Sequence, residues 1–300
     1  MLAFLAIYIV WGTTYLAILF GLDGFPPFLL SAIRFTVAGL LLIAWCIFKK
    51  KPLLPLKDLK VAVLSGIIML VGGSGLVTWA EQYIASGQAS IVIATEPFMF
   101  ILLDKKRWPV YFSKKNIIPG LLLGFGGVVL FFLFAKSNIA SAVPVNLKIA
   151  GYVVLFVSGI LWVLGSLYSK NHRNEMASNI VITAVQLLAA GIFSIILSAL
   201  TGELISFSLS HVSIKAWGGL LYLIFLGSIV AYLAFTWLLT VRPPAQVSTH
   251  TYINPVVALF MGWWIANEPL TWMQLVAVGI ILSGVLLTTK MNGEKVKSEM

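Results

Sequence analysis

Charged residues are scarce in this sequence, and their scarcity excludes an ordinary soluble protein. Asp, Glu, Lys and Arg together make up 10% of the 300 residues, whereas hydrophobic residues make up 60%. Soluble globular domains carry about 25% charged and about 45 to 50% apolar residues. The mean hydropathy of +1.01 points the same way. The composition therefore predicts an integral membrane protein.

Cysteine and histidine are also nearly absent, which removes several kinds of chemistry. The single cysteine, Cys46, has no partner for an intrachain disulfide or a cysteine-based metal site. His250 is the one histidine inside an expected membrane span, and no second His or Cys stands at metal-ligand spacing. No G-x-x-x-x-G-K-S/T loop is found, so an ATP-driven pump is excluded. We expect neither a metal nor a cofactor.

Long apolar runs, bounded by charges, Pro, Gly or Asn, fill most of the chain. A membrane-spanning helix needs about 20 apolar residues, whereas a spanning strand needs about 10 and alternates polar with apolar side chains. No such alternation persists, so the expected fold class is all-α integral membrane, with ten transmembrane helices. The expected helices are 2–20, 28–48, 60–79, 84–103, 116–135, 149–168, 179–200, 216–237, 245–265 and 271–289.

Basic residues are distributed unevenly between the two sides of such a bundle. Most of the 20 Lys and Arg residues fall in the even-numbered connections and the C-terminal tail. The odd-numbered connections hold only Lys136, Lys148 and Lys215. Because cytoplasmic loops are enriched in Lys and Arg, both termini are expected to be cytoplasmic. The same asymmetry accounts for the net charge of +10, and nucleic acid is not an expected partner.

Two stretches of the chain, 85–98 and 243–256, interrupt their apolar runs at the same places. Residues four apart share one face of a helix, so each stretch presents a polar stripe that ends at a proline. The matched positions are Gln88 with Gln246, Val92 with His250, Glu96 with Asn254 and Pro97 with Pro255.

The other helices of the first half also have counterparts in the second, such as Gly12 with Gly165 and Gly127 with Gly284. Each half contains five expected helices, which is an odd number. The chain therefore finishes the first half on the opposite side of the membrane, and the second copy must enter from there. Inverted repeats of this kind occur in secondary transporters, with the substrate site near the midplane. The expected domains are a first repeat at 1–137, a linker at 138–148, a second repeat at 149–290 and a polar cytoplasmic tail at 291–300.

Glu96 is the leading candidate for a functional group. It lies about 13 residues into its expected helix, near the midplane, where a charge costs roughly 2.5 to 3.5 kcal/mol. We interpret it as a proton carrier or a ligand for a cationic group. The alternatives are a buried partner for Arg34 and a carboxylic acid that only packs helices. Arg34 itself lies near the outer end of its helix, where it is expected to reach the interface, so we favour a structural role over the alternative of substrate contact.

Other residues on these helices are expected to line a central cavity. His250 is the second proton-coupling candidate, with a hydrogen-bonded packing role as the alternative. Trp11 and Trp162 are suited to stack on an organic substrate. Pro97 and Pro255 each free a backbone carbonyl and are interpreted as hinges, with static kinks as the alternative. The expected cavity-lining residues are Trp11, Thr14, Tyr15, Gln88, Thr95, Glu96, Trp162, Gln246, His250 and Asn254.

Several motifs, taken in order along the chain, resemble a known family. They are Trp11 to Tyr15, Pro26-Pro27 followed by Arg34-Phe35, Asn254-Pro255 followed by Asn267 to Leu270, and Gly284-Val285. This set resembles the EamA family of the drug/metabolite transporter superfamily, and especially its YedA-like members of the bacterial inner membrane. The resemblance implies a multi-pass, ten-helix transporter of small metabolites, amino acids or related amphiphiles, with no nucleotide site. The chain departs from the common pattern at 104–108 and at Glu96, where an uncharged residue is more usual.

The predicted function is therefore that of a secondary active transporter, an exporter that works by alternating access, and not that of an enzyme. The alternatives are a facilitative, channel-like protein and a membrane-embedded enzyme, for which Glu96 and His250 lack a visible chemical partner. The expected partners are a small-molecule substrate, membrane lipid and a coupled proton. Gly120 and Gly124 form a G-x-x-x-G motif, which indicates either close internal packing or a homodimer.

Overall fold

The computed structural model of the chain is built of helices. It describes residues 2–84, 86–113, 115–134, 143–174, 176–266 and 271–289. Every regular element in these ranges is helical, and six helices are long and apolar enough to cross a membrane, accompanied by shorter apolar ones. The chain is thus an all-helical membrane protein. The motif at 267–270, the first part of the expected linker 138–148 and the expected tail 291–300 lie outside the described residues.

The helices follow one another with short connections. Those of the N-terminal part are α1 (Leu2–Leu22), α2 (Pro27–Phe48), α3 (Leu56–Gly66), η1 (Ile67–Gly75), α4 (Leu76–Ala80), α5 (Ser86–Ile93), α6 (Glu96–Leu103), η2 (Lys105–Arg107), α7 (Trp108–Ser113) and α8 (Ile117–Leu133). Those of the C-terminal part are α9 (Val145–His172), α10 (Asn179–Leu200), α11 (Glu203–Ser206), η3 (Leu209–His211), α12 (Ile214–Tyr222), η4 (Leu223–Ala231), α13 (Tyr232–Val241), α14 (Pro244–Val247), α15 (His250–Ala266) and α16 (Trp272–Thr289).

Prolines set several of these boundaries. Pro26 precedes α2 in an extended conformation, and Pro27 occupies its first turn, where the missing N–H has no helical partner to lose. Pro55 and Pro144 stand in the same position before α3 and α9. The helices therefore start where the chain cannot continue a preceding one.

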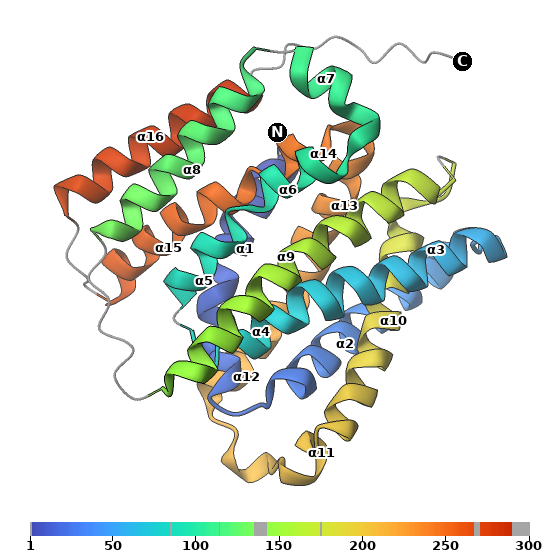
Figure 1. Cartoon of the computed structure of the whole chain (residues 1–300). Coiled ribbons are helices and arrows are strands. Elements are labelled where there is room, and N and C mark those ends of the chain that lie inside the picture. The colour runs from blue at the N-terminus through green and yellow to red at the C-terminus, as the bar shows by residue number, and fades with distance from the viewer. Residues whose placement is uncertain are drawn as a thin grey trace.

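Four helices pair across the two parts of the chain. α2 packs along α10 at one end of the molecule and α8 packs along α16 at the other, with α1, α9 and α15 between them (Figure 1). The outer faces of these pairs carry exposed apolar side chains, including Leu40, Ile196, Leu122 and Leu286. Such faces suit contact with lipid, which has no water to hydrogen-bond polar groups.

Glycines allow α2 and α10 to approach closely. A Cβ atom at Gly39 would lie 2.6 Å from the backbone nitrogen of Leu188. One at Gly191 would lie 2.5 Å from the backbone nitrogen of Thr36. Small residues of this kind let the backbones of membrane helices meet, which increases van der Waals contact.

The G-x-x-x-G motif of α8 serves the same purpose. A Cβ atom at Gly284 of α16 would collide with the backbone nitrogen of Gly124 and would lie 2.6 Å from the carbonyl oxygen of Gly120. The motif is therefore occupied by a helix of the same chain. Of its two interpretations, the structure favours internal packing over a homodimer.

Two of the expected helices are broken. A turn at 94–95 separates α5 from α6, and a turn at 248–249 separates α14 from α15. The first break lies just before Pro97, whose ring would clash with the helical carbonyl of Ile93. α15, in contrast, runs through Pro255. The break in the second stretch therefore lies upstream of its proline.

Two π-helical segments, η1 and η4, interrupt otherwise α-helical rods. η1 lies between α3 and α4, and η4 lies between α12 and α13. The sequence did not predict them, because one wider turn leaves the apolar pattern nearly unchanged. π-helical turns occur frequently at functional sites, and both segments face the same cavity in this molecule.

Candidate functional site

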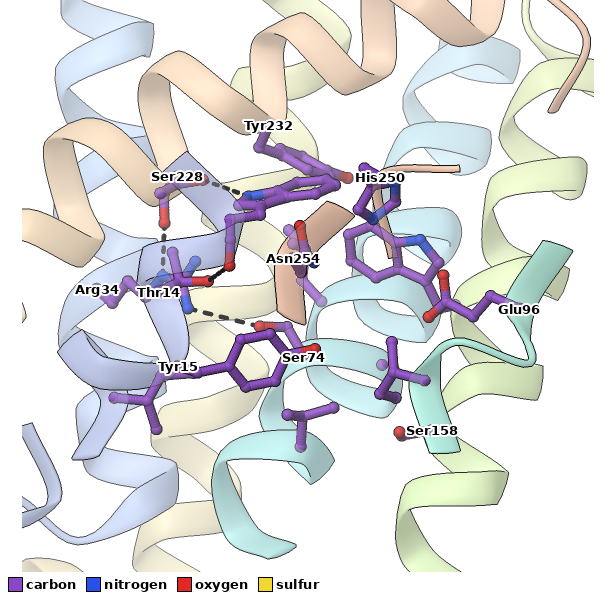
Figure 2. A pocket seen from close by; sticks show the side chains of 18 residues that line it. Thr14, Tyr15, Arg34, Ser74, Glu96, Ser158, Ser228, Tyr232, His250 and Asn254 are labelled. Carbon is purple, nitrogen blue, oxygen red and sulfur yellow. Dashed lines mark hydrogen bonds between the residues drawn. The ribbon is translucent and has the colours of Figure 1, made fainter. Parts of the chain in front are cut away.

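A cavity of about 90 Å³ lies inside the bundle. Its walls come from α1, α2, η1, α4, α5 and α6 on the N-terminal side, and from α9, η4, α13 and α15 on the C-terminal side. Among the described residues, none from α8, α10 or α16 contributes. The cavity has room for more than one water-sized group. Figure 2 shows its charged and polar side chains directed inward from several helices.

Arg34 enters the cavity from α2, and its side chain is only 6% exposed. Its Nε donates to Ser228 Oγ at 2.7 Å, and its Nη1 lies 3.5 Å from Ser74 Oγ. Gly227 leaves room for the guanidinium, since a Cβ there would lie 3.1 Å from Nη2. Hydroxyl groups do not neutralise the positive charge, and no ion pair joins Arg34 to an acid among the described residues.

This placement corrects the expectation that Arg34 reaches the membrane interface. The two serine hydroxyls, one on each π-helical segment, draw the guanidinium toward the centre of the bundle. Arg34 is also not the ion-pair partner of Glu96. The two charged groups lie on opposite sides of the cavity (Figure 2).

Glu96 stands on the wall facing Arg34. It is the first residue of α6 and is 4% exposed. Its Oε2 has no hydrogen-bond partner among the described residues. The break before α6 puts this carboxyl at a helix N-terminus, where unpaired N–H groups and the helix dipole favour negative charge.

Tyr15 and Asn254 lie between the two charged walls (Figure 2). The Asn254 amide lies beside the Tyr15 hydroxyl, and Tyr15 is within electrostatic range of both Glu96 and Glu81. Asn254 Oδ1 lacks a hydrogen-bond partner within the described part of the chain. Buried polar atoms are nearly always satisfied, and leaving one unsatisfied costs free energy. These free atoms therefore suit a ligand or water that enters the cavity.

An aromatic layer closes one side of the cavity. The Trp11 ring lies edge-on to Trp162 at 5.5 Å and contacts His250 at 4.7 Å, measured between ring centroids. Phe235 is fully buried and contacts both tryptophans at 5.1 Å. Trp11 Nε1 donates to the Gly227 carbonyl at 3.2 Å, whereas Trp162 Nε1 has no partner among the described residues. The layer offers flat apolar faces and one free donor.

A charged cluster lies beyond this layer, where α6, α9 and α13 end. Lys170 Nζ donates to the Arg242 carbonyl at 2.9 Å, at the negative end of α13. The Tyr111 hydroxyl donates to Asp104 Oδ2 at 2.8 Å, and Arg107 Nε lies 3.7 Å from the same oxygen. Burial and the adjacent carboxylate raise the pKa of Tyr111 above its usual range, so it remains a donor. Tyr111 also hydrogen-bonds with the backbone of Ala245, which joins the two parts of the chain at this end of the bundle.

A wider hollow of about 550 Å³ opens at the other end of the bundle, around the connection between α1 and α2. Asp23 and Glu203 both line it. The Glu203 carboxylate accepts hydrogen bonds from the backbone N–H groups of Phe28 at 3.2 Å and Leu29 at 2.8 Å. Glu203 therefore caps the N-terminus of α2 and has a structural role.

Most of the residues expected to line a cavity are brought together here. Those lining it are Trp11, Thr14, Tyr15, Glu96, Trp162, His250 and Asn254. Gln88, Thr95 and Gln246 do not line it. Thr95 Oγ1 donates to the Val92 carbonyl at 2.6 Å within the helix break, and Gln246 Nε2 donates to the Thr288 carbonyl of α16 at 3.3 Å. The expected polar stripe assumed unbroken helices, and the breaks turn these positions away.

Sequence reasoning missed part of the polar wall. Ser74, Ser158 and Ser228 line the cavity but were not singled out, because serine is common in membrane helices. A signal was present for two of them: Ser74 and Ser228 each follow a glycine, in helices of corresponding rank in the two halves. The glycine admits the guanidinium or an aromatic ring, and the serine supplies the hydroxyl.

Comparison with known proteins identifies the family. A model described as the EamA-like transporter family matches residues 1–133 and 149–290. The chain belongs to the EamA-like transporter family. The resemblance drawn from the motifs at Trp11, Asn254 and Gly284 is thereby confirmed.

Curated relatives match this EamA-like chain over nearly its whole length. "Uncharacterized inner membrane transporter YedA" of Escherichia coli (strain K12) is 32% identical over 288 residues, which covers 96% of this chain and 89% of the relative. "Uncharacterized transporter YoaV" of Bacillus subtilis (strain 168) is 25% identical over 303 residues and covers 96% of each chain. A solved structure titled "Crystal structure of protein" has a TM-score of 0.76 at 19% identity, over 96% of this chain and 95% of that one, and shares its fold.

These matches establish the general activity of the EamA-like chain. It is a membrane transporter and not an enzyme, as the sequence predicted. Its substrate is a small molecule. Like the YedA relative, it is a multi-pass protein of the inner membrane.

Proposed function

We propose that this transporter is a secondary active exporter of small amphiphilic metabolites, including amino acids, and that it works by alternating access. The observation that carries the proposal is the pair of charges, Arg34 and Glu96, on opposite walls of a buried cavity with no ion pair between them. A buried charge without a partner costs several kcal/mol. A transported ligand or proton that compensates each charge would offset this cost.

The walls define the chemistry of the substrate. The Arg34 guanidinium has N–H donors beyond those that face Ser74 and Ser228, and it can hold a carboxylate through two parallel hydrogen bonds. Glu96 attracts an ammonium group or takes up a proton. Trp11 and Trp162 offer faces for an apolar side chain or an organic cation. A small zwitterion with an apolar side chain satisfies all three parts of the cavity.

We further propose that the chain forms two inverted five-helix repeats, at 1–137 and 149–290, joined by 138–148 and followed by the tail 291–300. In this arrangement ten helices cross the membrane. The broken fourth and ninth helices put helix ends beside the cavity, as in other secondary transporters. In such proteins these ends face the substrate and the coupling ion near the midplane.

Reciprocal contacts between α2 and α10 support the repeat. Gly39 lies against Leu188, and Gly191 lies against Thr36. Thr36 and Leu188 each stand three positions before the glycine of their own helix. Surfaces that meet through equivalent residues are what a two-fold axis produces.

The same reciprocity relates α8 and α16. Gly127 lies against Ile281, and Gly284 lies against Gly124. Gly124 and Ile281 each stand three positions before the matched glycine of their helix. Both pairs at the two ends of the molecule therefore agree with one axis through the cavity.

Alternating access requires one side of the cavity to close while the other opens. With both termini in the cytoplasm, the aromatic layer around Trp11 and the cluster around Lys170 and Asp104 form the cytoplasmic gate. The 550 Å³ hollow then lies at the outer face.

Pro97 beside the break and Pro255 within α15 remain our candidates for hinges. His250, whose Nδ1 lies 3.0 Å from the Val247 carbonyl, is the second proton-coupling candidate.

Reconstituted proteoliposomes test the proposal. A thermal-shift screen of amino acids, nucleosides, sugars and cationic dyes first selects a ligand, and flux is then measured against a gradient and across pH. We expect accumulation driven by the proton gradient for wild type, and Glu96→Gln should lose the pH dependence because the amide cannot carry a proton.

Gln88→Ala is the matched control, because Gln88 lies on the preceding segment and does not line the cavity. Normal pH-dependent flux in Glu96→Gln would overturn the role of this carboxyl. Flux that runs only downhill in wild type would instead favour the facilitative alternative.

A further inference from the structure

Glu81 is a buried carboxyl that the cavity described above does not use. It lies in the turn after α4, between two spanning segments, and is 7% exposed. Neither carboxyl oxygen has a hydrogen-bond partner among the described residues. Burial alone raises the pKa of Glu81 well above its usual range. It therefore holds a proton at pH values at which an exposed glutamate is ionised.

Tyr15 connects this acid to the cavity. Tyr15 is within electrostatic range of both Glu81 and Glu96. Its hydroxyl can accept one hydrogen bond while donating another. Glu81, Glu96 and Asn254 each carry a buried oxygen without a hydrogen-bond partner among the described residues, and all three act on this one hydroxyl electrostatically or through a hydrogen bond. Tyr15 is thus the group that the acid at the end of α4 shares with the acid in the cavity wall.

Among the described residues, no basic group pairs with Glu81. The elements packed around it carry several titratable or charged side chains, but burial is the cause of its shifted pKa. These side chains are Tyr15 on α1, Arg34 on α2, Tyr83 in the same turn, and Lys148 and Tyr152 on α9. A buried acid without a compensating cation is stable mainly in its neutral form.

We propose that Glu81 is a second proton-binding site of this transporter, and that it exchanges protons with Glu96 through Tyr15. The end of α4 lies on the side of the wide hollow, since Trp79 and Gln82 line that hollow. Glu81 therefore receives protons from the water on that side. The inference rests on the proposed function only where it takes Glu96 as the proton carrier of transport.

The relay moves one proton and leaves Tyr15 unchanged. Water on the side of the hollow gives a proton to the Glu81 carboxylate. The Glu81 oxygens form no hydrogen bond with Tyr15 in this structure, so the transfer needs a bridging water or a closer approach of the groups. The neutral carboxyl then gives its proton to the Tyr15 oxygen through that contact while the Tyr15 hydroxyl proton passes to the Glu96 carboxylate. Tyr15 is neutral before and after, Glu81 is again ionised, and Glu96 is neutral.

Infrared difference spectroscopy on the reconstituted full chain tests the site without any transport assay. A pH jump changes the carbonyl band of each carboxyl that gains or loses a proton. We expect Glu81 and Glu96 each to contribute a carboxyl band in wild type, Glu81→Gln to lose the first of these bands and Glu96→Gln to lose the second. If Glu81→Gln leaves both bands in place, Glu81 is not a proton site and the inference is overturned.

Transport measurements test the connection between the two sites. Glu81→Gln should lose proton-driven accumulation yet keep exchange of labelled for unlabelled substrate, because the substrate cavity is intact. Tyr15→Phe should slow the equilibration of the Glu96 band with the bulk pH by at least tenfold. Equilibration at the wild-type rate in Tyr15→Phe would overturn the relay. Asp23→Asn, which removes an exposed acid from the hollow, is the control and should match wild type.

Stability measurements provide a readout in case a variant transports nothing. The native state keeps a proton on Glu81 that the unfolded state has already lost, so the free energy of unfolding falls as pH rises toward the folded pKa. Glu81→Gln should remove this part of the pH dependence, with a melting temperature at alkaline pH at least as high as that of wild type. A melting temperature below wild type at every pH would assign Glu81 a structural role and overturn the inference.

The transport assays also separate this inference from the proposed function. If Glu96→Gln loses proton coupling and Glu81→Gln has no effect on it, the proposed function stands and this inference is wrong.

Discussion

Arg34 is the single residue on which the proposed recognition of a substrate carboxylate depends most. Its guanidinium is held by Ser228 at 2.7 Å, which fixes the orientation of the remaining donors toward the cavity. Lysine carries the same charge but lacks the planar fork that matches a carboxylate. The two residues are therefore expected to differ in affinity for a substrate carboxylate even though their charge is equal.

The first residue-scale prediction concerns this difference. Arg34→Lys should raise the half-saturation concentration about tenfold or more, since a lost charged hydrogen bond is worth about 1.5 to 3 kcal/mol and 1.4 kcal/mol is tenfold. Arg34→Gln should abolish saturable transport. Concentration-dependent flux in proteoliposomes measures both. Arg242→Lys, at the end of α13, is the matched control, and an equal loss there would show that the effect is not specific to the cavity.

Residue chemistry could be predicted from the sequence only in part. Glu96 and Asn254 stood out because a polar group in an apolar run is costly, and both line the cavity. Arg34 was recognised, but its distance from the helix end suggested the interface, and only the serines on η1 and η4 explain its inward position. Glu81 gave no signal, because an acid at a helix end normally faces water.

Glycine contacts decide the packing at the scale of helices. Gly284 of α16 lies against the backbone of α8, so an added methyl group has no space there. Gly279 of the same helix has nothing within 4 Å of the position of a Cβ. The two glycines therefore provide a matched pair on one helix.

We predict that Gly284→Ala destabilises the protein by about 1 to 3 kcal/mol, the usual cost of overpacking a tight contact. Gly279→Ala should leave stability unchanged or raise it slightly, because alanine favours the helix over glycine. Melting in detergent followed by size-exclusion fluorescence measures the difference. Equal melting temperatures for the two variants would show that the α8–α16 contact is less tight than the structure indicates.

Helices themselves could be predicted from the sequence far better than their irregularities. Runs of about 20 apolar residues between prolines and charges define α1, α2 and α10 almost to the residue. The π-helical turns and the break at 248–249 depend on contacts between helices, such as that of Ser228 with Arg34, which no local pattern contains. Pro97 predicted a local disturbance, whereas α15 accommodates Pro255.

The orientation that we propose for the whole molecule, argued from its basic residues, can be tested directly. Cys46 is the single cysteine of the sequence, so Cys46→Ser gives a protein without thiols. In that background, Asp23→Cys should react with a membrane-impermeant thiol reagent added outside intact cells, because Asp23 lines the hollow that the proposed orientation places at the outer face. Lys57→Cys, before the third expected helix, should react only after the cells are opened. The reverse pattern would place both termini outside and would invert the proposed direction of the gate.

The all-helical architecture of the whole molecule was accessible from its apolar runs, and the proposed repeat added an expectation about which helices correspond. Matched glycines such as Gly127 and Gly284 already aligned the fifth and tenth helices, and the structure brings these two helices together. The sequence could not show which helices from different repeats would touch. Helix pairing across the chain depends on surface shape, which the apolar pattern does not encode.

The facing charges on the cavity walls have an electrical consequence. The charges of Arg34 and ionised Glu96 sum to zero, and a zwitterion bound between them also has no net charge. Carrying the zwitterion across the membrane therefore moves no net charge. A proton that moves inward in exchange for the exported substrate carries one elementary charge, on which the membrane potential does work of about 2.3 kcal/mol per 100 mV. The transporter should therefore generate a current only when transport is coupled to a proton, and export should be accompanied by an inward current.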